Sequence, residues 1–144
     1  MTAQKPVGLT AAAGYQIGVR RTIPVHSERV WEFFFSPEGL HLWLGDIDHI
    51  SLQKGQSYAT QDGITGEVRV VKPCEQVRMT WNKAEWAKPS TLQVRFLIPG
   101  PDKTTISFHQ EKLVDMKMRE AMKQRWEQAL TMIAEKLKSS VLFI

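Results

Sequence analysis

Residues 116–139 read MKMREAMKQRWEQALTMIAEKLKS, and this stretch decides the fold that we expect. Apolar side chains recur in it every three or four residues, at Met118, Met122, Trp126, Ala129, Ile133 and Leu137. That spacing places them on one face of an α-helix, with most of the charged residues outside it. At 1.5 Å per residue the helix spans about 36 Å. Since the strands predicted below are short, we expect their sheet to curve around this helix.

Most of the remaining chain alternates polar and apolar residues, which is typical of half-buried strands. The first such run begins at Gln16 and ends before Pro24. Five more follow, at residues 57–61, 64–71, 76–81, 91–98 and 104–113. Asp62-Gly63 is a strong hairpin turn signal. We predict a six-stranded antiparallel sheet with one solvent-exposed face.

Two short helices are predicted between the first two strands. Ser27 is the expected N-cap of the first, which carries apolar residues at helical spacing. Ser36-Pro37 ends this helix, and Pro37 suits the first position of the second, which Gly45 stops. The fold class is therefore α+β.

Length and composition favour a single domain. We assign residues 1–14 to a weakly ordered N-terminal arm, 15–139 to the domain and 140–144 to an apolar tail. With one cysteine, Cys74, no internal disulfide can form, and we expect a reducing compartment. No signal peptide or transmembrane segment is apparent, so a cytoplasmic location is expected. The net charge of +4 comes without any block of Lys and Arg, which argues against nucleic-acid binding.

Several short motifs, taken in order, resemble one known superfamily. They are Ile17-x-Val19-x-Arg21-x-Ile23, Val30-Trp31, Pro37-Glu38, Trp43, Gly66-Glu67-Val68, Pro73 to Val77, Thr80-Trp81, and Trp126 with Leu130, Ile133 and Leu137. The chain resembles the helix-grip, START-like (SRPBCC) superfamily, in the branch named for the activator of the heat-shock-protein-90 ATPase. The resemblance covers Gln16 to Leu137 and implies a helix-grip fold with an internal cavity. Through the chaperone branch, it also implies a link to the stress response.

The resemblance leaves the function open, because the superfamily includes lipid carriers, hormone receptors, polyketide cyclases and a chaperone-regulating domain. Many relatives carry a Thr-His pair late in the last strand, where this chain has His109-Gln110. By alternation Gln110 faces inward and His109 faces solvent. A role that needs an inward histidine at this point is therefore in doubt.

We expect a mainly apolar ligand cavity between the helix and the sheet, with few polar groups. The candidate lining residues are Arg21, Phe34, His41, Trp43, Tyr58, Met79, Trp81, Trp86, Phe96, Phe108, Gln110, Met118 and Met122. Plain core packing is the alternative. The loop 82–89 carries Trp86, which would fold back as a lid over the cavity or be offered to a partner.

Arg21 is the main polar candidate, because it shares a strand face with apolar residues. A buried guanidinium needs a partner. It could anchor a ligand carboxylate or carbonyl. It could instead pair with an acidic residue such as Glu32, or lie exposed at a sheet edge.

Catalytic and metal-binding motifs are absent from the sequence. Asp46, Asp48 and His49 could hold a divalent ion, but the more ordinary interpretation is a polar loop. His41 and Tyr58 are the only acid–base candidates, and neither has an evident activating neighbour. We predict no metal and no cofactor.

The leading hypothesis is non-catalytic binding of a hydrophobic or amphipathic small molecule in the internal cavity. The first alternative is a protein-binding, co-chaperone-like adaptor, served by the apolar tail Val141–Ile144 and the positive charge. The tail could also mediate homodimer formation. The second alternative is a cyclase- or dehydratase-like enzyme that uses the same cavity.

Overall fold

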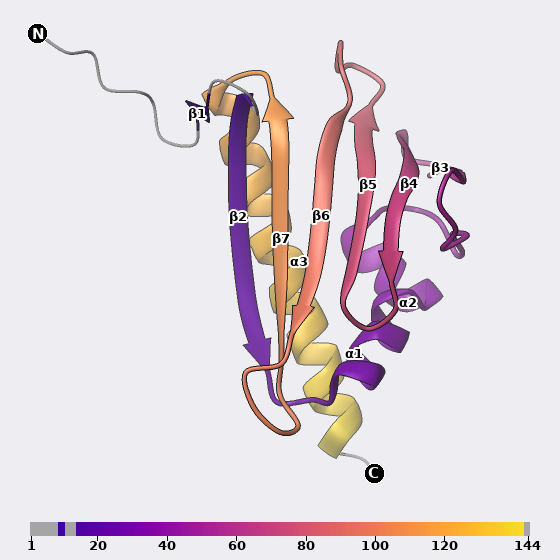
Figure 1. Cartoon of the computed structure of the whole chain (residues 1–144), viewed down its shortest axis with the longest axis vertical. Coiled ribbons are helices and arrows are strands. Elements are labelled where there is room, and N and C mark those ends of the chain that lie inside the picture. The colour runs from indigo at the N-terminus through magenta and orange to yellow at the C-terminus, as the bar shows by residue number, and fades with distance from the viewer. Residues whose placement is uncertain (1–8, 11–13, 143–144) are drawn as a thin grey trace, which may run out of the picture.

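The computed structural model describes residues 9–10 and 14–142. One antiparallel sheet lies across a long helix, and two short helices pack beside that helix (Figure 1). The strands are β1 (Leu9–Thr10), β2 (Gly14–Ile23), β3 (Ser57–Ala59), β4 (Ile64–Lys72), β5 (Gln76–Lys83), β6 (Ser90–Leu97) and β7 (Thr104–Leu113). The helices are α1 (Ser27–Phe34), α2 (Pro37–Trp43) and α3 (Met116–Leu142).

The order of strands in the sheet is β1-β2-β7-β6-β5-β4-β3. The six predicted strands are present as β2 to β7, and all pairs are antiparallel. The first predicted strand, β2, pairs with the last, β7, so that the meander is joined to the beginning of the domain. The two residues of β1 extend the sheet beyond β2, next to Gly14 and Tyr15.

The ends of the helices differ from the prediction in two places. The N-cap of α1 is His26 and not Ser27, because the His26 imidazole Nδ1 accepts a hydrogen bond from the Glu28 N–H at 3.3 Å. Helix α3 continues to Leu142 and not only to Ser139, since no glycine or proline interrupts residues 139–142. The start of the predicted apolar tail is therefore helical.

The remaining parts of the predicted arm and tail, residues 1–8, 11–13 and 143–144, lie outside the described residues. Helix α2 begins as predicted, with Pro37 in its first turn and the Ser36 hydroxyl accepting a hydrogen bond from the Gly39 N–H at 3.1 Å. Cys74 occupies the turn between β4 and β5 with a φ of 62°. Within the described part of the chain, no helix is long and apolar enough to cross a membrane.

Candidate binding site

The structure brings most of the predicted lining residues together in the core between α3 and the sheet. Trp86 and Met118 are partly buried against this core. The others that lie there are buried almost completely, and they are Phe34, Trp43, Tyr58, Met79, Trp81, Phe96, Phe108, Gln110 and Met122.

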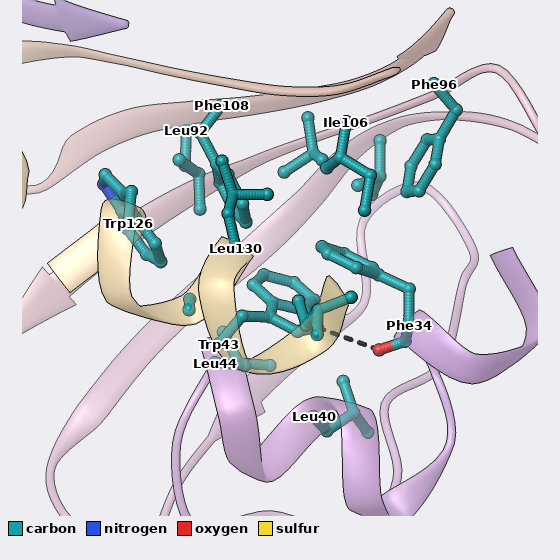
Figure 2. Close-up of a cluster of buried hydrophobic side chains, with 14 of the residues drawn as sticks. Phe34, Leu40, Trp43, Leu44, Leu92, Phe96, Ile106, Phe108, Trp126 and Leu130 are labelled. Carbon is teal, nitrogen blue, oxygen red and sulfur yellow. Dashed lines mark hydrogen bonds between the residues drawn. The ribbon is translucent and has the colours of Figure 1, made fainter. Parts of the chain in front are cut away.

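The aromatic rings of this core pack directly on one another. The ring of Phe34 stacks on Trp43 with centroids 4.3 Å apart, and the Trp43 indole N–H donates to the Phe34 carbonyl at 2.8 Å (Figure 2). Phe108 stacks on Trp126 at 4.8 Å, with an interplanar angle of 10°. Trp81 meets the edge of the same Trp126 ring at 5.7 Å. Side chains thus occupy the space where a ligand was expected.

Three buried polar side chains of the core, those of Gln110, Ser90 and Trp126, form a chain of hydrogen bonds. The Gln110 amide nitrogen donates to the Ser90 hydroxyl at 2.8 Å, and its oxygen accepts from the Trp126 indole N–H at 2.8 Å. The Ser90 hydroxyl donates in turn to the Trp81 carbonyl at 2.6 Å. Gln110 faces inward, as predicted, and His109 bonds to Gln16 at 2.9 Å on the other face. Gln110 is therefore engaged in holding the core together.

Tyr58 is likewise engaged within the fold. Its hydroxyl donates to the Thr80 carbonyl at 2.6 Å, and burial raises the pKa of the Tyr58 phenol far above its ordinary value. The phenol stays protonated under all physiological conditions. This geometry suits a structural hydrogen bond better than proton transfer.

Arg21 does not enter the core. It is half-buried on β2, and its guanidinium donates to the Thr131 hydroxyl of α3 at 3.3 Å. No ion pair with Glu32 forms, because that side chain lines a separate hollow beside α1. Arg21 thus lies half-buried between β2 and α3, with its guanidinium outside the aromatic core.

Two open hollows meet at Arg20 and Arg21. The first, of about 560 Å³, lies between β2 and α3 and is also lined by Lys123 and Glu127. The second, of about 660 Å³, extends toward the end of β6, where Leu97 and Ile98 line it. Neither hollow is lined by the aromatic rings of the core. The sequence offered no signal for Arg20 and Lys123 beyond their charge.

His41 also lies at the surface, outside the core. Its Nε2 is 2.8 Å from an Asp48 carboxylate oxygen and its Nδ1 is 3.9 Å from one of Asp46, beside a hollow of about 400 Å³. The sequence analysis grouped Asp46 and Asp48 with His49. In the structure, the histidine beside these two aspartates is His41. Among the described residues, no three histidine, cysteine or acidic side chains are arranged to hold a metal ion.

Arg125 was not predicted as a site residue. Its side chain lies between the aromatic core and the end of α2. Its guanidinium lies over the rings of Trp81 and Trp126, at 5.1 and 5.5 Å from their centroids. It also donates to the carbonyl of Leu44 at 3.1 Å. Burial lowers the pKa of Arg125, and the nearby Asp62 carboxylate opposes this shift. An arginine beside an apolar stripe is ordinary in a helix, so nothing in the sequence set it apart.

The loop between β5 and β6 folds back onto the domain, in the position predicted for a lid. The ring of Trp86 lies 5.1 Å from that of Trp81 and is partly exposed. Trp81 itself is fully buried, and its indole N–H has no hydrogen-bond partner among the described residues.

The family assignment follows from the length of chain that one family profile covers. The profile described as "Activator of Hsp90 ATPase homolog 1-like protein" matches residues 24–138, which include α1, α2, β3 to β7 and most of α3. The chain belongs to this family of Hsp90-ATPase activator homologues. The resemblance to the helix-grip, START-like superfamily is thereby confirmed. No curated protein matches the chain.

Solved structures of other proteins share this fold. An Hsp90 activator from Plasmodium falciparum is 18% identical, with a TM-score of 0.74 over 85% of this chain and 96% of that one. Protein MLL2253 from Mesorhizobium loti is 21% identical, with a TM-score of 0.74 over 86% and 97%. CalU16 from Micromonospora echinospora is 19% identical, with a TM-score of 0.73 over 85% and 73%. At these identities the likeness establishes the fold alone.

Proposed function

We propose that this domain is a non-catalytic, protein-binding module whose partner is an Hsp90-type ATPase. The single observation that carries the proposal is the packed interior, since stacked rings fill the space that a carrier would keep for its ligand. The accessible hollows open on the surface instead. The family description and the Hsp90 activator from Plasmodium falciparum support the choice of partner.

The surroundings of the acid–base candidates also favour binding over catalysis. Tyr58 is buried and protonated, and its hydroxyl is already used by the Thr80 carbonyl. His41 is half-exposed, and its imidazole contacts the Asp48 and Asp46 carboxylates beside a hollow that Asp62 and Arg125 also line. No serine, threonine or cysteine is among the residues that line this hollow in the described part of the chain. With an Hsp90-type partner, we place the protein in the cytoplasm and in the response to stress.

The proposal is tested with the Hsp90-type ATPase of the same cell. Sedimentation velocity should detect a complex between the two proteins, and the rate of ATP hydrolysis should change as the domain is titrated. An unrelated basic protein of equal net charge serves as the control. If no complex forms and hydrolysis does not change, the proposed partner is wrong.

Binding of an apolar or amphipathic small molecule is a second candidate, favoured by one observation. The buried indole N–H of Trp81 has no hydrogen-bond partner among the described residues, and the partly exposed Trp86 and the Lys83 ammonium lie near its ring on the loop side. An acceptor group on a ligand could satisfy this N–H if the loop opened. A panel of fatty acids and aromatic polyketides should then include a compound that raises the melting temperature and shifts the Trp81 indole resonance. A panel without effect on either readout would exclude this candidate.

A further inference from the structure

Within the described residues, one edge of the sheet has no strand beside it over most of its length. On the side of β2 that faces away from β7, the described neighbour is the two-residue strand β1, which pairs with Gly14 and Tyr15. Residues 17–23 of β2 therefore have no strand partner on that side among residues 9–10 and 14–142 (Figure 1). Backbone N–H and C=O groups on a free edge can pair with an added strand.

Cationic side chains gather along this edge. Arg20 is exposed, and the half-buried Arg21 and Lys123 line the hollow between β2 and α3. Within the described chain, Arg20, Arg21 and Lys123 form no ion pair, and the Arg21 guanidinium donates a hydrogen bond to the uncharged Thr131 hydroxyl. Glu127 is the one acidic residue that lines the same hollow. The edge therefore carries a net positive charge.

The two hollows offer room and apolar contact beside this charge. They flank β2 at Arg20 and Arg21, with volumes of about 560 and 660 Å³. In the second, the side chains of Leu97 and Ile98 are 42% and 64% exposed. Large aliphatic groups left open next to cations suit a partner that is both acidic and apolar.

We infer that residues 17–23 of β2 bind an extended acidic segment of a partner protein, which adds a strand to the sheet. Adjacent residues of a strand point to opposite faces, so that Arg20 and Arg21 would each meet one of two adjacent carboxylates. The inference rests on the proposal that the domain binds a protein, and it adds the surface and the chemistry of the partner.

Charge argues against a second copy of this chain as the occupant. Pairing β2 with its own copy would bring the Arg20 and Arg21 side chains of both chains to one seam. Facing like charges across a strand pair destabilise it. A carboxylate-bearing segment gains from the same arginines, because opposite charges both attract it and fix its register.

The test measures binding of a labelled peptide by fluorescence anisotropy. The peptide has a central Glu-Glu pair flanked by valine and threonine and matches residues 17–23 in length. The double variant R20E/R21E should weaken binding by about tenfold or more, since two attractive contacts become repulsive. The control K54E/K88E makes the same change of net charge at two exposed lysines away from β2 and should bind within roughly twofold of the native protein. Circular dichroism melting confirms that both variants fold.

Backbone pairing is tested separately from charge. Along a strand, the N–H groups of alternate residues point to opposite sides, and an N-methyl group removes the hydrogen-bond donor. We use two forms of the peptide, one methylated at the odd-numbered residues and the other at the even-numbered residues. Because only one side of the added strand can face β2, one form should lose binding and the other should keep it. Amide resonances of residues 17–23 should shift on addition of the active form.

Several results would overturn the inference. The first is binding of the peptide by R20E/R21E as tight as that by the native protein. The second is equal affinity of the native protein for the two methylated peptides. The third is a dimer of the native chain in which β2 pairs with its own copy. If R20E/R21E still forms the complex with the Hsp90-type ATPase, the inference about the edge fails and the proposed function stands. If the peptide binds as expected but the ATPase does not, the edge inference stands and the proposed partner fails.

Discussion

The indole N–H of Trp126 donates a 2.8 Å hydrogen bond to the side-chain oxygen of Gln110, and both side chains are fully buried. This bond joins the middle of α3 to β7. The ring of Phe108 stacks on the same indole, so that polar and apolar contacts meet on one residue. A specific bond inside a packed core fixes the position of the helix along the sheet more narrowly than ring packing alone.

Replacement of Gln110 with leucine should lower the free energy of unfolding by about 1–3 kcal/mol, because the Trp126 N–H is left buried without an acceptor. Urea unfolding measures the change. The matched control is His109→Leu, which removes a bond to Gln16 on the outer face of the sheet and should cost under about 1 kcal/mol. Equal losses in the two variants would contradict the role assigned to Gln110.

Replacement of Arg125 with methionine should destabilise the domain by about 1–3 kcal/mol, because the Leu44 carbonyl and the rings of Trp81 and Trp126 lose their contacts with the guanidinium. Arg125→Lys should give an intermediate loss, since an ammonium lacks the planar group that lies on the rings. Thermal unfolding followed at a tryptophan emission wavelength reports both changes.

The control for Arg125 is Lys136→Met on the exposed side of the same helix. It should change stability by no more than about 0.5 kcal/mol. A lysine variant at residue 125 as unstable as the methionine variant would show that charge has no part in the contact.

Two glycines in different strands of the sheet, Gly66 in β4 and Gly18 in β2, should respond oppositely to replacement by alanine. A Cβ at Gly66 would overlap the Thr80 carbonyl and the Tyr58 hydroxyl, so Gly66→Ala should cost about 1–3 kcal/mol. A Cβ at Gly18 would lie 3.7 Å from its nearest neighbour, the Phe108 carbonyl, at ordinary contact distance. Gly18→Ala should therefore stabilise the domain by about 0.4–1 kcal/mol. Melting temperatures that move in the same direction would contradict this contrast.

The stability of the domain should fall in acid partly through Asp62. A hydrogen bond with the Thr60 side chain, and then one from the Asp46 N–H at 2.8 Å, lower the pKa of the Asp62 carboxyl. A lowered pKa in the folded state stabilises the fold above the unfolded value of about 3.9, and this contribution is lost as the pH falls through the folded value. Asp62→Asn should thus be less stable than the native protein at neutral pH, with the difference shrinking below about pH 4.

The control for Asp62 is Asp102→Asn in the exposed turn before β7, where φ is 56° and asparagine is well tolerated. Chemical unfolding at neutral pH should give this variant a stability within about 0.5 kcal/mol of the native protein. An Asp62 variant whose stability difference stays constant with pH would rule out the linkage.

Periodicity predicted the elements of this fold well, because each depends on local spacing. The six strands and the inward position of Gln110 follow from alternation along the chain. The N-cap of α1 was predicted at Ser27 and lies at the adjacent His26. Both side chains can accept a hydrogen bond from the backbone, and only the backbone geometry decides which of the two residues caps the helix. The extension of α3 to Leu142 was missed for a similar reason, since Ser139 permits a helix end without requiring one.

The site was predicted less well than the fold. The sequence indicated correctly that Phe34, Trp43 and Phe108 share the interior, since each lies on an apolar face. Whether such rings line a hollow or fill it depends on how they interlock, and a Phe34–Trp43 stack at 4.3 Å leaves no room between them. Arg21 was placed on the correct face of β2, but its position at the edge depends on strand order.

The amino-acid sequence by itself determined the order of strands and helices, because the period of apolar residues sets both the strands and the apolar stripe of α3. The helix-grip arrangement of these elements was what the resemblance of the motifs implied. The tertiary structure alone decided that the rings of the core stack on one another and that Arg20 and Arg21 of β2 lie beside open hollows, on a stretch of β2 that β1 does not cover. These properties depend on distances between residues far apart in the chain, such as Arg21 and Thr131, and no local pattern encodes such distances.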